Sequence, residues 1–356
     1  MVPIDSEKLG TSSVEAWALE RLQADGLADP LRSVLTELVG LLENERLREH
    51  EVFLTVIVRT QAKRWEQLQD SLLCLAAQTD QDFEVLLMLH EVSLEDESRV
   101  RGLIAAFPEA FASRVRLQTV QGGGRTRPLA VAIDSVRGQY VAFFDDDDLL
   151  MADWVEVFHE GARLTPGQVI RANVAVQNNS PERWTNGVFG QRSVSAAVPA
   201  YAAHFNLVDH LERNRTPFMA FAFPSAFFTL WGEGFDEELP VLEDWDVALR
   251  ATGLLGVNSR PELTAIYRHW VDASTSYTSH DQEEWDAAAR AVRSRLSEAP
   301  LLMPMGTITD TIDVLARESR VHEEIAAVLR SPFWRLSAPL RWAVNRLRGI
   351  RSKIRR

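Results

Sequence analysis

Four consecutive aspartates, Asp145 to Asp148, are the residues whose type and spacing first suggest chemistry in this chain. They follow directly on the mostly apolar run from Tyr140 to Phe144. Adjacent carboxylates repel one another, and a divalent cation such as Mn²⁺ or Mg²⁺ relieves that repulsion because it prefers hard oxygen ligands. An isolated acidic run is more often a solvated turn, so the surrounding sequence has to decide between these two interpretations.

Two further segments carry residues that suit an anionic substrate and a proton transfer. In QGGGRTR, residues 121–127, three glycines permit close approach of the backbone to a ligand. Arg125 and Arg127 lie beside an expected helix start and suit anionic groups. A flexible loop explains this segment equally well. Glu243 and Asp244 begin an amphipathic helix, where acidic residues either complement the helix dipole or supply a general base. His269 is either a structural side chain or part of a metal or phosphate site.

Short apolar runs alternate with helical patterns from residue 52 onward. This alternation is typical of a parallel α/β sheet covered by helices on both faces. The expected strands are 52–58, 83–89, 115–120 and 139–144, with helices at 65–77, 100–107 and 128–136. The aspartates then lie at the carboxyl end of a central strand, where open α/β sheets hold their ligands, and the solvated-turn interpretation loses weight.

The remainder of the chain is expected to add helices and two strands. The predicted strands are 168–176 and 263–267, and the predicted helices are 201–213, 243–254, 281–296 and 308–329. Residues 1–50 show a leucine stripe at helical spacing, which indicates either a short coiled coil or packing on the main domain. We therefore expect an N-terminal helical extension at 1–50, a main domain at 51–300, a helical segment at 301–330 and a tail at 331–356.

Composition restricts the class of protein. Of 356 residues, 46% are apolar and 25% charged, as in an ordinary globular protein, and a single cysteine, Cys74, excludes an internal disulfide. The start of the chain lacks the pattern of a secretory signal, so a cytoplasmic location is expected. The apolar stretch 216–231 is shorter than a spanning helix and holds two prolines, which favours buried core over membrane.

Charge is distributed unevenly along the chain. Residues 330–356 contain nine Lys or Arg and no acidic residue, which leaves 29 basic against 51 acidic residues in the rest of the chain. The apolar residues of this tail share one helical face, a pattern typical of peripheral attachment to an anionic membrane at its inner face. Docking of the tail on the acidic body is the alternative. Nucleic acid is not an expected partner, because the main domain is acidic and shows no recognition motif.

Three segments, in this order, resemble the family 2 glycosyltransferases, whose GT-A fold is a Rossmann-like, mostly parallel sheet flanked by helices. They are VFLTVIVRTQAKRWEQLQDSLLCLAAQTDQDFEVLLML, GQYVAFFDDDDLL and GFDEELPVLEDWDVALRA. The likeness spans about residues 52 to 275. It implies an inverting, metal-dependent, hexosyltransferase-like enzyme that moves a sugar from a nucleotide-diphospho-sugar to a hydroxyl of a cell-envelope glycan or lipid-linked acceptor.

The resemblance also implies roles for individual residues. Asp244 would be the catalytic base with Glu243 supporting it, and Asp147 would hold Mn²⁺ or Mg²⁺ together with His269. The residues implied in nucleotide-sugar binding are Arg59, Thr60, Glu91, Gly123, Arg125, Arg127, Asp145 and Asp146.

The chain departs from the family pattern at two points. After the second strand it reads LHEVS instead of Asp-Asp-Gly-Ser, so Glu91 would have to substitute in recognition of the base, and RTRPLAVAI replaces the usual Ala-Arg-Asn-x-Gly helix start. The nucleotide therefore stays open. A non-catalytic binding or scaffold protein of the same fold at the membrane is the alternative function, and a nucleotidyltransferase is a further one.

Overall fold

The computed structural model describes residues 13–183, 189–271, 280–298, 303 and 307–330. The chain divides into two compact units, residues 1–305 and 306–356. The predicted basic tail, 331–356, lies outside the described residues, as does most of the connection between residues 299 and 306. The division of the chain expected from the sequence stays a prediction.

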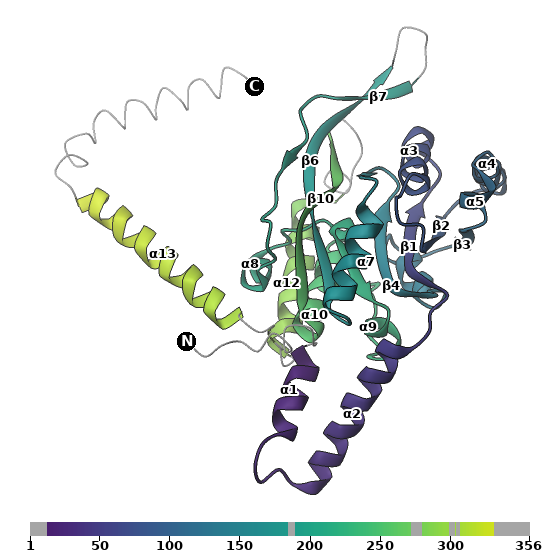
Figure 1. Ribbon diagram of the computed structural model, residues 1–356. Coiled ribbons are helices and arrows are strands. Elements are labelled where there is room, and N and C mark those ends of the chain that lie inside the picture. Colours follow the sequence, from purple (N-terminus) through teal and green to yellow (C-terminus); the bar gives the residue numbers. More distant parts are fainter. Residues whose placement is uncertain (1–12, 184–188, 272–279, 299–302, 304–306, 331–356) are drawn as a thin grey trace. The chain divides into compact units, whose positions relative to one another are not determined.

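The first half of the sheet is a parallel array (Figure 1). Strands β1 (Val52–Thr60), β2 (Phe83–His90), β3 (Val115–Val120) and β4 (Gly138–Asp145) lie in the order β3-β2-β1-β4. Every residue of β2 is buried, which explains why the strand reads as a continuous apolar run without alternation. The four strands predicted from the apolar runs are confirmed.

The second half of the sheet mixes strand directions. Strand β9 (Phe221–Pro224) lies antiparallel between β4 and the long strand β6 (Val169–Arg183), and β10 (Val257–Trp270) runs parallel to β6. Strands β5 (Leu149–Leu150), β7 (Phe189–Ser193) and β8 (Val198–Pro199) add short antiparallel pairs. Most of the stretch 216–231 is buried core as predicted, but the strand β9 within it was not expected.

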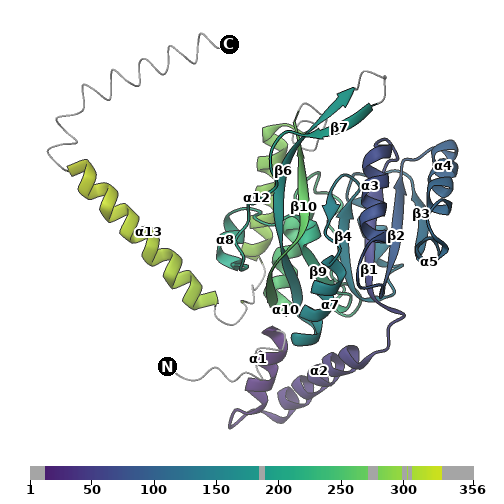
Figure 2. The same ribbon diagram turned by 45° about the horizontal axis from the view of Figure 1, so that its top comes forward.

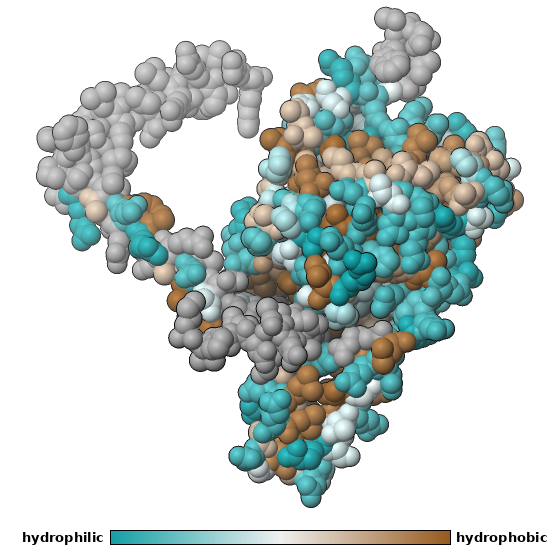
Figure 3. All heavy atoms as spheres, viewed as in Figure 1, coloured by the Kyte–Doolittle hydropathy of each residue, from teal (hydrophilic) through white to brown (hydrophobic). Residues whose placement is uncertain are grey.

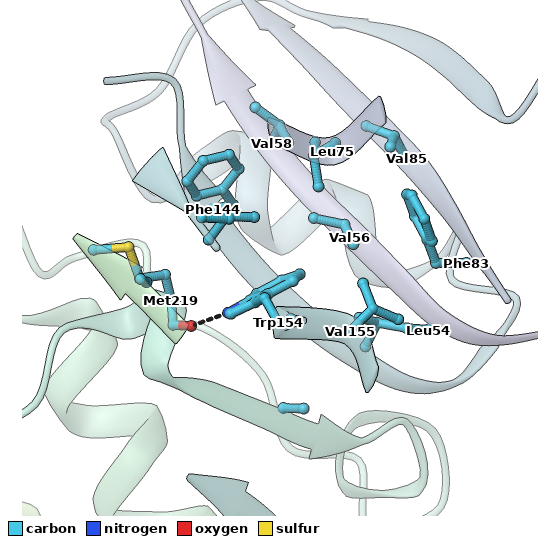
Figure 4. Close-up of a cluster of buried hydrophobic side chains, with 14 of the residues drawn as sticks. Leu54, Val56, Val58, Leu75, Phe83, Val85, Phe144, Trp154, Val155 and Met219 are labelled. Atoms are coloured by element: carbon cyan, nitrogen blue, oxygen red, sulfur yellow. Dashed lines mark hydrogen bonds between the residues drawn. The ribbon is translucent and has the colours of Figure 1, made fainter. Parts of the chain in front are cut away.

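Helices cover both faces of the sheet (Figure 2). On one face α3 (Trp65–Ala76), α4 (Leu94–Ala105), α5 (Glu109–Ala112) and α7 (Trp154–Leu164) pack on side chains of β1, β2 and β4. Figure 4 shows the centre of this layer, where the fully buried Trp154 packs against Leu54 and Phe144 and donates a 2.9 Å hydrogen bond to the Met219 carbonyl. Burial of the indole N–H is thereby compensated.

The opposite face holds the helix that carries Glu243 and Asp244. Here α6 (Arg127–Ile133), α9 (Ala226–Thr229), α10 (Glu243–Leu255) and α12 (Gln282–Glu298) surround a core rich in phenylalanine. Two ion pairs from Arg295, to Asp236 and to Asp246, fasten α12 to the segment around α10. The short helix α8 (Leu207–Glu212) completes this layer. The 3-10 turn η2 (Phe218–Ala220) contributes to both cores, Met219 and Ala220 to the first and Phe218 to this one.

The N-terminal extension is a pair of helices, α1 (Ser13–Leu22) and α2 (Asp29–Leu47). They bury Ala18, Leu35 and Val39 against each other, and α1 contacts α10, so the extension packs on the main domain. Apolar residues remain exposed on this helix pair, among them Trp17 and Val34 (Figure 3). Helix α13 (Thr307–Arg330) forms the described part of the second unit. Among the described residues, no helix is long and apolar enough to cross a membrane.

Candidate functional site

The aspartate run begins at the carboxyl end of β4, next to the end of β1. In the parallel register Asp145 lies beside Arg59, and the Arg59 Nε donates a 2.9 Å hydrogen bond to Asp145 Oδ1. The second guanidinium arm of Arg59 donates to Glu243 Oε1 at 3.0 Å and to the Arg125 carbonyl at 3.1 Å. One buried cation therefore joins β1, β4, the glycine-rich loop and the start of α10.

A second cation reinforces this arrangement. The Arg125 Nε lies 3.0 Å from Glu243 Oε1, and the Glu243 side chain is only 3% exposed. A buried carboxylate needs such charge-assisted partners, because the cost of removing it from water is large. Burial alone would raise the pKa of Asp145, but the nearby positive charges of Arg59 and Arg125 outweigh burial and hold it below its usual value. Asp145 is therefore ionised in the neutral pH range.

The other three aspartates repel one another. Burial, and then the charge of Asp147, raise the pKa of Asp146 to about 7. The same two causes raise the pKa of Asp148 well above its ordinary value, while burial is the main cause of a raised pKa at Asp147. The Thr60 hydroxyl donates to Asp146, and Arg64 forms an ion pair with Asp147. The fold thus gathers more negative charge here than its own cations neutralise.

This donor set fits a hard divalent cation. Its atoms are carboxylate oxygens, and their mutual repulsion is the kind that Mn²⁺ or Mg²⁺ relieves. Within the described ranges, no group of three or more His, Cys, Asp or Glu side chains is placed to hold a metal by itself. Magnesium-type sites commonly use one or two carboxylates and take the remaining oxygens from phosphates and water. The aspartate run meets that requirement.

Helix α10 begins in a strained turn. Leu242, the residue before the helix, adopts φ +67°, a conformation that leucine rarely occupies and that places Glu243 and Asp244 on the first turn. The two carboxylates diverge: Glu243 turns to Arg59 and Arg125, whereas Asp244 Oδ2 accepts a 2.8 Å hydrogen bond from the Asn214 amide. Burial, and then the charge of Glu243, raise the pKa of Asp244 to about 6.

A cavity of about 280 Å³ opens between these groups. Charged side chains line part of this cavity, and aromatic and other apolar side chains line the rest. The charged lining residues are Arg59, Arg125, Asp145, Asp148, Glu243 and Asp244. A concave site that combines an apolar wall with converging charged groups and a carboxylate of raised pKa is the arrangement expected of a binding or catalytic site.

Comparison with known proteins identifies the fold and the family. Residues 55–230 match the family model described as glycosyl transferase family 2. The chain belongs to this family. The structure of S. aureus TarS 1-349 in complex with UDP-GlcNAc aligns with a TM-score of 0.53 and 17% identity, over 70% of this chain and 68% of that one. This likeness confirms the expected GT-A fold.

Other comparisons are weaker. The structure of GalNAc-T7 with UDP, GalNAc and Mn²⁺ aligns with a TM-score of 0.44 and 12% identity, over 63% of this chain and 45% of that one. No curated protein matches the sequence.

In this glycosyltransferase, five of the residues singled out from the sequence line one cavity. They are Arg59, Arg125, Asp145, Glu243 and Asp244. They come from β1, the glycine-rich loop, β4 and α10, segments far apart in the sequence that the parallel register brings to one edge. The remaining seven predicted residues are not among the lining residues of the cavity: Thr60, Glu91, Gly123, Arg127, Asp146, Asp147 and His269.

Several of these seven stabilise the site's loops. The Glu91 side chain, on a turn with φ +57°, accepts a hydrogen bond from the Gly122 backbone N–H. Gly123 has φ +76°, and a Cβ added there would lie 2.8 Å from the Arg127 Cβ. Arg127 itself pairs with Glu237 at 2.8 Å. The His269 Nδ1 lies 3.2 Å from Asn178 Oδ1 on β6. The nucleotide-binding and metal roles of these residues stay predictions.

Three further residues at the site received no individual role from the sequence. Arg64 pairs with Asp147, Asp148 lines the cavity, and Asn214 binds Asp244. Asn214 is held by a short turn, since its Oδ1 accepts from the Thr216 N–H, and the buried His210 bonds the Thr216 hydroxyl at 2.8 Å. The fourth consecutive aspartate was a visible signal, whereas a single asparagine in a loop carries none.

Replacing Arg59 should destabilise the glycosyltransferase. Arg59→Met leaves Asp145 and Glu243 short of a cation, and loss of one partner of a buried ion pair costs about 3–5 kcal/mol. Urea denaturation of the metal-free protein measures the free energy of unfolding. As control, Arg101→Met removes an exposed ion pair with Glu97, which is expected to change stability by less than about 0.5 kcal/mol. Equal stability of the two variants would contradict the central role of Arg59.

Proposed function

We propose that this family member is an inverting, metal-dependent glycosyltransferase that uses a nucleotide-diphospho-sugar as donor. The observation that carries the proposal is Asp244: a half-buried carboxylate with a pKa raised to about 6, in the same cavity as the cationic pair Arg59 and Arg125. General bases work best with a pKa near the working pH. The TarS structure, of the same fold, was determined with UDP-GlcNAc, which supports a UDP-sugar as the first donor to test.

In the proposed reaction Asp244 removes the proton of the acceptor hydroxyl. The oxygen then attacks the anomeric carbon from the face opposite the nucleoside diphosphate, the carbon–oxygen bond to the diphosphate breaks, and the configuration inverts. The Asn214 amide fixes one oxygen of Asp244, and the Trp245 N–H donates to the other at 2.8 Å. Asp244 is thereby oriented before the substrate arrives.

Negative charge develops on the departing diphosphate. Arg59 and Arg125, at the junction of β1, the glycine-rich loop and α10, are placed to attract that charge, and the cavity walls exclude part of the water that would screen it. A divalent cation bound at the aspartate run would supply further neutralisation of the diphosphate. We propose that Asp147 would hold it together with His269, as predicted from the sequence, and with Asp148, which lines the cavity. Asp145 and Asp146 would lie on the nucleotide side.

We propose a cell-envelope glycan or a lipid-linked glycan as the acceptor, reached from the cytoplasmic face of the membrane. The sequence of the tail supports this, because nine Lys or Arg without an acidic residue between 330 and 356 favour attachment to anionic lipid. A non-catalytic scaffold of the same fold is the second candidate. A scaffold gives no reason for a carboxylate of raised pKa in the same cavity as two arginines, so the enzyme is favoured.

Substitution of Asp244 should separate catalysis from donor binding. We expect Asp244→Asn to lower transfer by at least about 100-fold, because no group then accepts the proton. A panel of nucleotide-sugars with Mn²⁺, tested by thermal unfolding, should still raise the Tm of the variant, since a ligand of the folded state stabilises it. Asp134→Asn, at the exposed end of α6, is the control. Full activity of Asp244→Asn would remove Asp244 from its role.

The rate should follow the ionisation of Asp244. The carboxylate is active when deprotonated, so kcat/KM should fall about tenfold per pH unit below pH 6 and level off above it. Asn214→Ala removes a hydrogen bond to the charged form, which raises the pKa of Asp244 and moves the profile to higher pH. A profile that is flat between pH 5 and 7, or one that Asn214→Ala leaves in place, would speak against this assignment.

The tail should bind anionic membranes. Deletion of residues 330–356 is expected to abolish sedimentation with phosphatidylglycerol vesicles, because each basic residue near the surface contributes roughly 1 kcal/mol. Vesicles of phosphatidylcholine alone are the control, and salt should weaken the binding of the full chain. Unchanged sedimentation of the deletion variant would refute the proposed attachment.

A further inference from the structure

The cavity has two halves that diverge at the start of α10. Glu243 faces the cationic half, with Arg59 and Arg125, whereas Asp244 faces Asn214 in the segment after α8. The proposed function assigns the cationic half to the donor's diphosphate. The half that Asp244 faces is then the half from which an acceptor hydroxyl reaches the base.

Trp285 also lines this cavity. Trp285 lies in the first turn of α12 and shares one helical face with the buried Ala288 and Val292, so its position is fixed by packing against the core around α10. It is half-buried and lines the cavity together with Asn214 and Asp244. Helix α12 follows the segment that matches the family model, 55–230, so the family match assigns Trp285 no role.

The chemistry of this half favours a sugar ring. Trp285 supplies a broad apolar surface, and Phe218 and Tyr201 line the same cavity. A pyranose presents C–H groups on one face, which pack on an aromatic ring, and hydroxyls at its edge, which bond polar groups such as the Asn214 amide.

Charge argues against a phosphate-bearing acceptor. Glu283 and Glu284 directly precede Trp285, and both are exposed on the first turn of α12. The arginines that line the cavity, Arg59 and Arg125, are paired with Glu243 in the other half. Both cavity arginines are thus engaged elsewhere, and the acidic start of α12 adds negative charge near Trp285, so a phosphate is disfavoured there.

We propose that Trp285 is the stacking platform of an acceptor subsite, and that the acceptor is an uncharged pyranose unit whose hydroxyl is presented to Asp244. The inference rests on the proposed function for the identity of the acceptor half. It assigns Trp285 a role in specificity: the residue binds the ring that receives the new sugar and leaves binding of the donor unaffected.

Saccharide binding to the full chain tests the proposal. Saturation-transfer NMR titrations would use methyl pyranosides of glucose, galactose, mannose and N-acetylglucosamine, and glycerol 3-phosphate, each with and without UDP and Mn²⁺. We expect at least one methyl pyranoside to bind, with an affinity that falls roughly tenfold in Trp285→Leu and is largely kept in Trp285→Phe. Trp17→Leu, on the exposed face of α1, is the matched control and should bind as the unaltered chain does.

The outcomes separate this inference from the proposed function. Protection by UDP and Mn²⁺ against thermal unfolding should be equal in the unaltered chain and in Trp285→Leu, which also shows that the variant folds. Loss of nucleotide protection in the unaltered chain would contradict the donor proposal. Equal pyranoside affinity in Trp285→Leu, binding of glycerol 3-phosphate in preference to every pyranoside, or no pyranoside binding at all would overturn the acceptor subsite.

Discussion

The ion pairs of Arg59 with Asp145 and Glu243 are the interaction on which the site depends. Arg59 is the last but one residue of β1, Asp145 ends β4, and Glu243 begins α10, so this one guanidinium connects three elements that are far apart in the sequence. Burial would lower the pKa of Arg59, but its two carboxylate partners raise it above the ordinary value, and the residue keeps its charge. The positive charges of Arg59 and Arg125 orient the Glu243 carboxylate toward them. Asp244, its neighbour on the first helical turn, points instead to Asn214. Loss of the cation would disturb both halves.

Backbone strain is concentrated around the same edge of the sheet. The non-glycine residues with positive φ among the described residues are Ala62, just after β1, Glu91, just after β2, and Leu242, just before α10. Each of these conformations costs free energy that the surrounding packing must offset. Leu242 shows what the strain achieves, because the left-handed turn directs the helix start, with both carboxylates, into the cavity. A fold selected only for stability would place glycine at such turns, so the strain is consistent with a site that requires fixed side chains.

Much of the parallel half of the fold could be predicted from the sequence, because fully buried strands such as β2 appear as uninterrupted apolar runs between helices with an apolar stripe. The mixed half could be predicted only in part: the expected strands 168–176 and 263–267 lie within β6 and β10, but β9 was not expected. Strand β9 has only four residues within a phenylalanine-rich segment, and its pairing with β4 and β6 is a long-range contact without a local signal. The site divides in the same way: Asp145 and Asp244 stand in recognisable motifs, whereas Asn214 and Trp285 reach the cavity through the packing of α8, α10 and α12. Arg59 and Glu243 are 184 residues apart, and their pairing likewise depends on the strand order. No spacing in the sequence indicates it.

The electrostatics of the two halves are coupled through Glu243. Burial is the main cause of the raised pKa of Asp244, and the negative charge of Glu243 raises it further. Arg125, the Trp245 N–H and Arg59 lower it. If the donor's diphosphate lies against the two arginines, its negative charge offsets theirs, and the pKa of Asp244 rises further. If Asp244 is the base, as proposed, it would therefore be stronger when the donor is bound, provided that the working pH stays above its pKa. In the proposed reaction, a water molecule without donor would face a weaker base than an acceptor hydroxyl in the loaded enzyme. The two arginines proposed to attract the leaving group would thus also make proton removal dependent on the presence of the donor.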